Sequence, residues 1–384
     1  MRFDHIRLTN WKNFREIEVD LPDRAFLIGP NASGKSNFLD AFRFLRDVAA
    51  PGGGLQRACA ERGGFSKIRC LSARDVTHVG IEVTLRDNDD TWVYELLFNR
   101  QSKSAPVIVV EEEKVWKNGQ ILLERPDIDD RTDPLRLTQT ALEQIVANRA
   151  FRSVVEHFVA ISYLHLVPQM VRDATGLLKD APIPDMYGGH FLEKIANTPK
   201  NTQGARLRKI EQFLKIVVPQ LENLKIETDQ RGTPHLEVTY AHWRPRAGKQ
   251  DENQLSDGTL RLIGLLWALQ DGSGLLLMEE PELSLHKAIV TQLAPFIYKT
   301  LRSNKKAVRQ VFMSTHSADL LSDPGIGAEE ILIFIPDKNG TNIQLGYEID
   351  AIRSLMEFGT PASEAALPHT EPESTIQQLR LFEA

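Results

Sequence analysis

One octapeptide, Gly29-Pro-Asn-Ala-Ser-Gly-Lys-Ser36, constrains what this chain can fold into more than any other feature. It fits the pattern G-x-x-x-x-G-K-[ST], whose backbone N–H groups curl around a phosphate at the start of a helix. The apolar residues 25–28 read as a short buried strand before it, and residues 37–45 carry apolar side chains at helical spacing. This strand–loop–helix context predicts an α/β fold that binds a nucleoside triphosphate; a chance glycine loop is the alternative.

The types of residue in the loop indicate how a phosphate would be held. Lys35 would reach the β- and γ-phosphates, and the Ser36 hydroxyl would ligate Mg²⁺. The N-terminus of the following helix would add the positive end of its dipole. ATP and Mg²⁺ are therefore the expected ligands.

A second group of motifs lies far downstream. Leu255-Ser-Asp-Gly-Thr259 precedes an apolar helix, and alone it would be an ordinary helix N-cap. The apolar residues 275–278 follow and end in Glu279-Glu-Pro-Glu282, and a predicted strand at 310–313 leads into Ser314-Thr-His-Ser317. Isolated, the glutamates would be a solvated acidic turn and His316 a packing or surface residue.

The order of these motifs resembles the heads of ABC-type ATPases, and within them the RecF/SMC-like branch. The run Ile6-Arg-Leu-Thr-Asn-Trp-Lys-Asn-Phe14 and the phrase Gly-Pro-Asn-x-Ser-Gly-Lys-Ser-Asn are also typical of that branch. The signature Leu-Ser-Asp-Gly-Thr and the run Glu-Glu-Pro-Glu-x-x-Leu-His-Lys look like its compact bacterial members, relatives of RecF and of the OLD nucleases. The resemblance covers residues 1–70 and 250–347 well.

The resemblance implies roles for particular residues in phosphoryl transfer. Glu280 would orient the attacking water, His316 would contact the γ-phosphate, and Lys35 would complete the catalytic set. Ser36 and Glu279 would hold the metal, although the family more often has aspartate at the place of Glu279. Pro281 should bias Glu280 toward an extended backbone.

The resemblance also implies a homodimer. In the family architecture a signature cannot reach its own phosphate loop and instead caps the nucleotide of a second subunit. ATP would then be held between two heads arranged head to tail. The implied nucleotide contacts are Gly29, Asn31, Ala32, Ser33, Gly34, Lys35, Ser36 and Asn37, with Ser256 and Gly258 supplied by the other subunit.

We expect an ABC-type P-loop head with an antiparallel β subdomain and an inserted helical lobe. Alternating strands are predicted around a turn at 87–90 and around Asn118-Gly119, and helices at 135–147, 151–161 and 212–218. The insertion shows no sustained heptads, which argues against a coiled-coil arm. The expected divisions are the N-terminal half of the head at 1–125, the lobe at 126–222, the C-terminal half at 223–349 and a disordered polar tail at 350–384.

Composition bounds the function. The formal net charge is −6, so DNA contact would need a local basic patch. The candidate patches are Lys200, Arg206, Arg208 and Lys209; Arg244, Arg246 and Lys249 beside Trp243; and Arg302, Lys305, Lys306 and Arg309; each also reads as a solvated face. The two cysteines lack metal-ligand spacing, and no apolar run approaches a membrane span, so a cytoplasmic protein is expected.

Two further sites stay open at this level. Gln56 is a candidate for the glutamine that couples nucleotide to lobe, but a glycine-rich surface loop explains it equally well. Near the C-terminus, Gln378, Leu379, Leu381 and Phe382 resemble a peptide that docks on the replication sliding clamp, and a short amphipathic end packing on its own head is the alternative.

The favoured function is an ATPase that engages or senses DNA, in repair or in anti-phage defence, with a partner supplying any nuclease or toxin. A transporter subunit is disfavoured by the early strands and the large insertion. An ATP-gated interaction scaffold that does not act on DNA is the remaining alternative.

Overall fold

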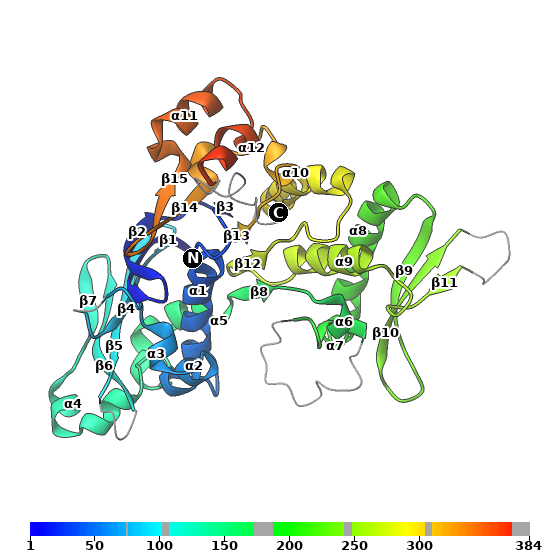
Figure 1. Ribbon diagram of the computed structural model, residues 1–384. Coiled ribbons are helices and arrows are strands. Elements are labelled where there is room, and N and C mark those ends of the chain that lie inside the picture. The colour runs from blue at the N-terminus through cyan, green and yellow to red at the C-terminus, as the bar shows by residue number, and fades with distance from the viewer. Residues whose placement is uncertain (74–75, 102–106, 173–186, 242–247, 304–308, 371–384) are drawn as a thin grey trace, which may run out of the picture. The chain divides into compact units, whose positions relative to one another are not determined.

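The structure is a computed structural model that describes all residues except 74–75, 102–106, 173–186, 242–247, 304–308 and 371–384 (Figure 1). The chain forms two compact units. Unit 1 comprises Met1–Ser162, Ser273–Leu277 and Ala307–Ala384, and unit 2 comprises Tyr163–Gly272 and Met278–Lys306. These borders differ from the predicted ones, because residues 126–162 of the predicted lobe belong to unit 1.

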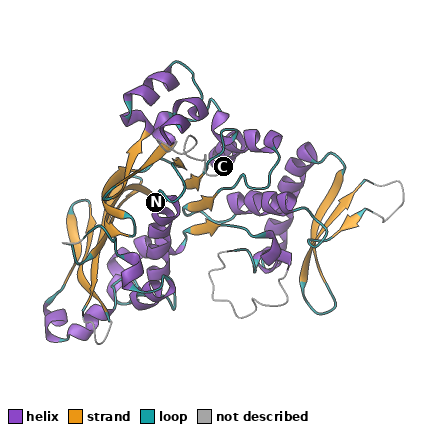
Figure 2. Ribbon diagram, viewed as in Figure 1, coloured by secondary structure: helices purple, strands orange, loops and turns teal. Residues whose placement is uncertain are grey.

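An antiparallel sheet of order β2-β1-β4-β5-β6-β7 forms one layer of unit 1 (Figure 2). Its strands are β1 (Arg2–Trp11), β2 (Phe14–Asp20), β4 (Val79–Asp87), β5 (Asp90–Arg100), β6 (Ile108–Lys117) and β7 (Gln120–Arg125). Apolar side chains alternate along β5, and both predicted hairpin turns are present, with Asn88 and Asn118 in the left-handed conformation such turns require. The predicted β subdomain is confirmed.

A second sheet has the order β15-β14-β3-β13-β12-β8. Its central strand β3 (Arg24–Ile28) is entirely buried and pairs in parallel with β13 (Val311–Ser314) and β14 (Ile331–Asp337). The remaining strands are β8 (Ser162–Leu164), β12 (Leu276–Glu279) and β15 (Gly340–Leu345). The chain passes between the two units at β8 and within β12.

Helix α1 (Lys35–Ala49) follows β3 and packs on α5 (Arg152–Val159), while α2 (Leu55–Glu61) and α3 (Phe65–Ile68) complete this part of unit 1. The contact between sheet and helix is aromatic: Phe42 meets Phe3 at 5.1 Å and Phe312 at 5.4 Å between ring centroids. Edge-to-face pairs of this kind each add about 0.5–1.5 kcal/mol beyond burial. The helix that follows the phosphate loop and the strands beside it therefore share one hydrophobic core.

Two predicted segments of unit 1 are different in the structure. Residues 135–147 form no α-helix; the chain there runs through the short helical turns η1 (Pro134–Thr138) and η2 (Ala147–Phe151), beside α4 (Ile128–Thr132). The buried Glu113 carboxylate accepts the Ala141 N–H, and Arg125 donates to the carbonyls of Arg136 and Gln139. Those side chains take the backbone groups that a helix would have used.

Residues 350–370 of the predicted disordered tail are folded, and the rest of that prediction, at 371–384, lies outside the described residues. Residues 350–370 form α11 (Asp350–Glu357), α12 (Ala362–Ala365) and η6 (Leu367–Thr370), following η5 (Gly346–Glu348). Ile352, Ala362 and Ala365 are buried, and α12 packs against η3 (Leu320–Ser322), beyond which lies η4 (Ala328–Glu330). Small apolar residues at helical spacing anchor this otherwise polar segment to unit 1.

Unit 2 combines helices with a three-stranded sheet of order β11-β10-β9. Its helix α9 (Asp257–Gln270) packs against α8 (Lys200–Val217), α10 (Lys287–Ser303) and α6 (Pro168–Arg172). The end of α9 is tied to α8, since Arg206 donates to Asp271 at 2.7 Å. The other elements are α7 (Phe191–Ala196), β9 (Leu221–Thr228), β10 (Pro234–Tyr240) and β11 (Lys249–Gln250).

Candidate nucleotide site and signature

The phosphate loop is shaped by two glycines and held by Asn13. Gly29 and Gly34 have φ angles of 156° and 100°, and a Cβ on Gly34 would lie 2.1 Å from the Asn13 amide. That amide donates to the Ser33 carbonyl at 3.0 Å and to the Thr341 hydroxyl at 2.8 Å, and its oxygen accepts from Asn37 at 2.8 Å. These hydrogen bonds of Asn13 hold the loop in this conformation.

The loop presents donors suited to an anion. Lys35 is buried, and its Nζ donates to the carbonyls of Gly29 and Pro30 at 2.8 and 2.9 Å. Gly34 supplies no side-chain cap to α1, and the buried Ser33 hydroxyl has no hydrogen-bond partner among the described residues. A phosphate at this helix N-terminus would satisfy these groups, so the residues present fit a bound nucleotide. The remaining predicted contacts, Asn31, Ala32, Ser36 and Asn37, lie at the surface or only partly buried.

His316 lies at the same sheet edge as the phosphate loop. It follows β13, which runs parallel to β3, and the Thr315 N–H donates to the Leu27 carbonyl at 3.1 Å. The side chain of His316 is exposed, whereas Thr315 beside it is fully buried. Within unit 1 the structure therefore brings Lys35 and His316 to the carboxyl ends of neighbouring parallel strands, where ligands of α/β sheets bind.

Glu279 is the last residue of β12 and Glu280 follows it; both belong to unit 2. The expected extended backbone at Glu280 is wrong: its φ is 42°, in the left-handed region. The cause is a tight turn immediately after the strand, in which the Leu283 N–H donates to the Glu280 carbonyl at 3.0 Å. Such a conformation in a residue other than glycine costs about 1–2 kcal/mol, and strain of this kind concentrates at functional sites.

Arg261 shares a small pocket, of about 20 Å³, with Glu279, Glu280 and Pro281. It projects from α9, and its Nε is buried without a hydrogen-bond partner among the described residues. The sequence analysis missed this arginine. The sequence hint for Arg261 was weak: it is a cation five residues after Ser256, on a largely apolar helix.

The signature is built as a capped helix start. The Ser256 hydroxyl accepts the Thr259 N–H at 3.2 Å, which satisfies one free amide of α9. A Cβ on Gly258 would lie 2.5 Å from the Ser284 carbonyl, so this glycine packs directly on the loop that follows Glu280. Ser284 is itself left-handed, with φ 64°.

Arg172, at the end of α6, holds the signature from the other side. It donates to the Asp257 carboxylate at 2.6 Å, to the Leu255 carbonyl at 2.8 Å and to the Glu252 carbonyl at 3.2 Å. Planar guanidinium groups suit such a fork of acceptors. Sequence reasoning did not find Arg172, because it lies 85 residues from Asp257 and in no motif.

Other candidates have structural roles. Gln56 donates to the carbonyls of Ile108 and Thr138 and accepts the Ile108 N–H, which ties α2 to β6. Arg206 pairs with Asp271, and buried Arg309 donates to the Gly274 carbonyl. Lys249 pairs with Glu237. Trp243, Arg244, Arg246, Lys305, Lys306 and the clamp-like Gln378, Leu379, Leu381 and Phe382 lie outside the described residues.

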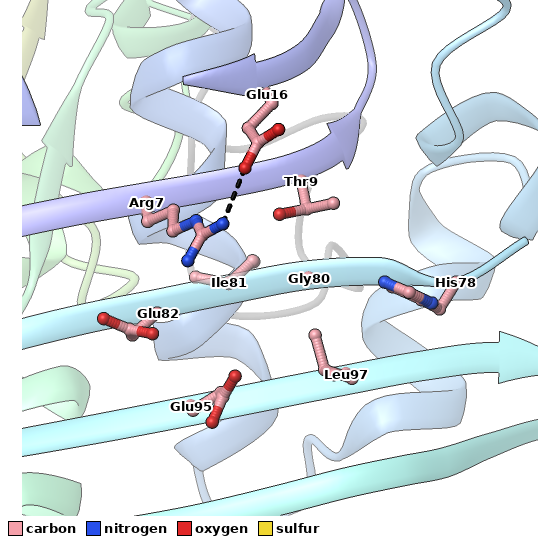
Figure 3. Close-up of a pocket in the computed structure, with 9 residues that line it drawn as sticks. All are labelled: Arg7, Thr9, Glu16, His78, Gly80, Ile81, Glu82, Glu95 and Leu97. Carbon is pink, nitrogen blue, oxygen red and sulfur yellow. Dashed lines mark hydrogen bonds and ion pairs between the residues drawn. The ribbon is translucent and has the colours of Figure 1, made fainter. Parts of the chain in front are cut away.

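A second, charged pocket lies on the face of the antiparallel sheet (Figure 3). Glu82 and Glu95 are direct cross-strand neighbours in it, and Arg7 donates to Glu16 at 2.6 Å. Partial burial, and then the charge of Glu82, raise the pKa of Glu95. In the described parts of the chain no group of three or more His, Cys, Asp or Glu could hold a metal.

Comparison with known proteins assigns the fold and the family. Residues 24–323 match the family described as "AAA domain, putative AbiEii toxin, Type IV TA system". The chain belongs to this family of ATPase domains. A curated relative is endonuclease GajA of Bacillus cereus (strain VD045), 20% identical over 348 residues, which cover 84% of this chain and 56% of GajA. The chain thus spans little more than half the length of that relative.

Solved SMC heads have the same fold. An SMC head bound to the C-winged helix domain of ScpA gives a TM-score of 0.57 at 13% identity, over 90% of this chain and 98% of that one. A head with an extended coiled coil, bound to the C-terminal domain of ScpA derived from Pyrococcus furiosus, gives 0.53 at 12% identity, over 93% and 99%. The predicted RecF/SMC-like head is confirmed. None of the described helices is long and apolar enough to cross a bilayer.

Proposed function

We propose that this chain hydrolyses ATP with Mg²⁺, closes head to tail as a homodimer on ATP, and engages or senses DNA in repair or anti-phage defence. The observation that carries the proposal is the phosphate loop, because Asn13 fixes its shape while Lys35, Ser33 and the α1 amides remain suited to an anion. The similarity to the endonuclease GajA supports a DNA-linked role.

Each step of ATP hydrolysis is assigned to particular residues of this chain. Lys35 and the loop amides bind and neutralise the transferred phosphoryl group, and His316 contacts it from the next strand. Glu280 orients the attacking water, and Ser36 with Glu279 would hold Mg²⁺, which supplies charge neutralisation when bound. Ser256 and Gly258 would cap the nucleotide of the partner subunit with the N-terminus of α9.

The test is ATP turnover by the full chain, alone and with duplex or single-stranded DNA. Lys35→Ala serves as the blank, and Glu280→Gln should bind ATP but lose turnover by about 10²-fold or more. Stimulation by one DNA form would identify the ligand that is sensed. Turnover that persists in Lys35→Ala would refute the assigned site.

A protein-triggered ATPase that does not act on DNA is the second candidate. It is favoured by the internal pairing of Arg206, Arg309 and Lys249, which removes three cations from the predicted DNA patches. Turnover indifferent to both DNA forms would support it.

A further inference from the structure

A long apolar groove crosses unit 2 away from the signature turn. Its walls are one side of α8 and one side of α10, its floor includes Leu266 of α9, and its volume is about 790 Å³. The α10 wall runs from Ala288 to Thr300, about 18 Å at 1.5 Å per residue. That length matches roughly three turns of a further helix.

The lining is largely apolar, and part of it is exposed to water. Phe213 and Phe296 meet across the groove at 4.5 Å between ring centroids, and Ile216 on the α8 wall is 79% exposed. Residues Ile289, Gln292 and Phe296 recur at the spacing by which helix surfaces accept ridges from a partner helix. Exposed apolar surface of this extent marks interaction sites.

The charge around the groove has one sign. Lys209 on the α8 wall and Lys299 on the α10 wall line it, and none of the described carboxylates does. Neither lysine has an ion-pair partner among the described residues. Glu211, on the same helix, is turned to β9, where it accepts the Leu224 N–H, and it pairs with Lys215.

We propose that this groove binds an amphipathic helix of a partner protein, with apolar residues on one face and glutamate or aspartate along both borders. Helix-in-groove recognition uses apolar anchors at i, i+3, i+4 and i+7, and the two lysines would pair with the bordering carboxylates. Nucleic acid does not suit an apolar lining with two cations. The proposed groove depends on the proposed function in one respect, which is that the partner is identified as the effector or the trigger of the ATPase.

The floor and one end of the groove belong to the elements that carry the signature and the turn after Glu280. Leu266 lies two turns along α9 from Gly258, and His286 lines the groove and caps α10 by accepting the Ala288 N–H at 3.2 Å. A helix seated there would hold α9 and α10 at one spacing, and with it the contact between Gly258 and Ser284. Partner binding would therefore alter turnover.

The test uses the full chain and a fluorescein-labelled designed helix of fifteen residues, with leucines on one face and glutamates at both borders. Fluorescence anisotropy should show binding, and a version with lysine for glutamate should bind at least tenfold more weakly. The double variant Lys209→Glu, Lys299→Glu should reverse that preference. Ile216→Asp should weaken binding at least tenfold, while Ile145→Asp, at a 74% exposed site of unit 1, should not.

Several results would overturn the proposal: no binding of the acidic helix at 100 µM, equal binding of both helices, or indifference to the lysine reversals. A halved mass of Ile216→Asp in sedimentation would instead assign the groove to a second copy of this chain. Helix binding is measured without nucleotide. If the helix binds but the chain does not hydrolyse ATP, the groove proposal is supported and the proposed function is refuted. If the chain hydrolyses ATP but the helix does not bind, the groove proposal is refuted and the proposed function is supported.

Discussion

Gly258 of the signature and Ser284 of the turn after Glu280 are in direct backbone contact, with the Ser284 carbonyl 2.5 Å from the position of a Cβ on Gly258. The signature and the turn after Glu280 are therefore packed against each other without space for a side chain at Gly258. The contact lies wholly within unit 2.

Replacing Gly258 by alanine should displace the Ser284 loop, because a carbonyl cannot yield as the end of a flexible side chain can. We expect destabilisation by about 1–3 kcal/mol and a loss of ATP turnover. Urea unfolding and steady-state hydrolysis measure the two effects. Gly204→Ala, near the start of α8, is the matched control, since its Cβ would meet only the end of the Arg208 side chain, at 3.6 Å. Equal behaviour of the two variants would contradict the contact.

Arg172→Ala should lower turnover about tenfold with ATP affinity nearly unchanged, because it releases Asp257 and the Leu255 carbonyl but touches no phosphate-loop residue. Lysine should not restore the fork. Separate measurement of kcat and of nucleotide Kd decides the matter. Arg231→Ala, in the exposed turn between β9 and β10, is the control; a larger change in Kd than in kcat would show that Arg172 acts elsewhere.

Asn13→Ala should weaken ATP binding about 5–30-fold, because it frees the phosphate loop from Thr341 and Asn37 without removing a nucleotide contact. Titration of a fluorescent ATP analogue gives the affinity. Thr341→Val removes only one of these hydrogen bonds and should have a smaller effect. If Asn13→Ala binds ATP as the natural chain does, the loop is held by its glycines alone.

Asp40 should make stability fall in acid. Burial alone would raise its pKa, but Arg62, Lys12 and Arg43 lower it to about 2 from 3.8. Its contribution, about 2 kcal/mol, is present above pH 4 and is lost as the pH falls through 2. Asp40→Asn should cost about 3–5 kcal/mol at pH 7, since it leaves buried cations uncompensated. The difference in unfolding free energy between the two chains should shrink on acidification; a constant difference would refute the assignment.

Glu95 should act in the opposite sense. Its pKa is raised by burial and by Glu82, so its ionisation destabilises the folded chain as the pH rises through that pKa. Glu95→Gln should stabilise by a few tenths of a kcal/mol at pH 7, a value reduced by solvent screening, and by nothing below pH 4. Glu124→Gln, on the exposed edge strand, is the comparison; a loss of stability in Glu95→Gln at pH 7 would exclude repulsion by Glu82.

The sequence pattern predicted the structure correctly where interactions between residues close in sequence determine it. Alternation along β5, the Asn118-Gly119 turn and the apolar spacing of α1 all predicted the observed elements. Residues 135–147 were mispredicted, because Arg125 and Glu113 claim their backbone groups across the sheet. The same holds for the residues of the candidate site. Sequence motifs located Lys35, Ser256 and Glu280, whereas Arg172 and Arg261 come near the site only through the tertiary fold. The rule for residues before proline failed at Glu280 because the turn to Leu283 outweighs it.

The hydrogen bonds of Asn13 to Ser33 and Thr341 join the turn between β1 and β2, the phosphate loop and β15, the last strand among the described residues. A ribosome delivers these three pieces at very different times. While the nascent chain is shorter than about 340 residues, the loop lacks one of its anchors, whatever the rest of the domain has achieved. Full affinity for nucleotide would then be reached only late in the synthesis of the ATPase domain, and products truncated before Thr341 would bind it more weakly.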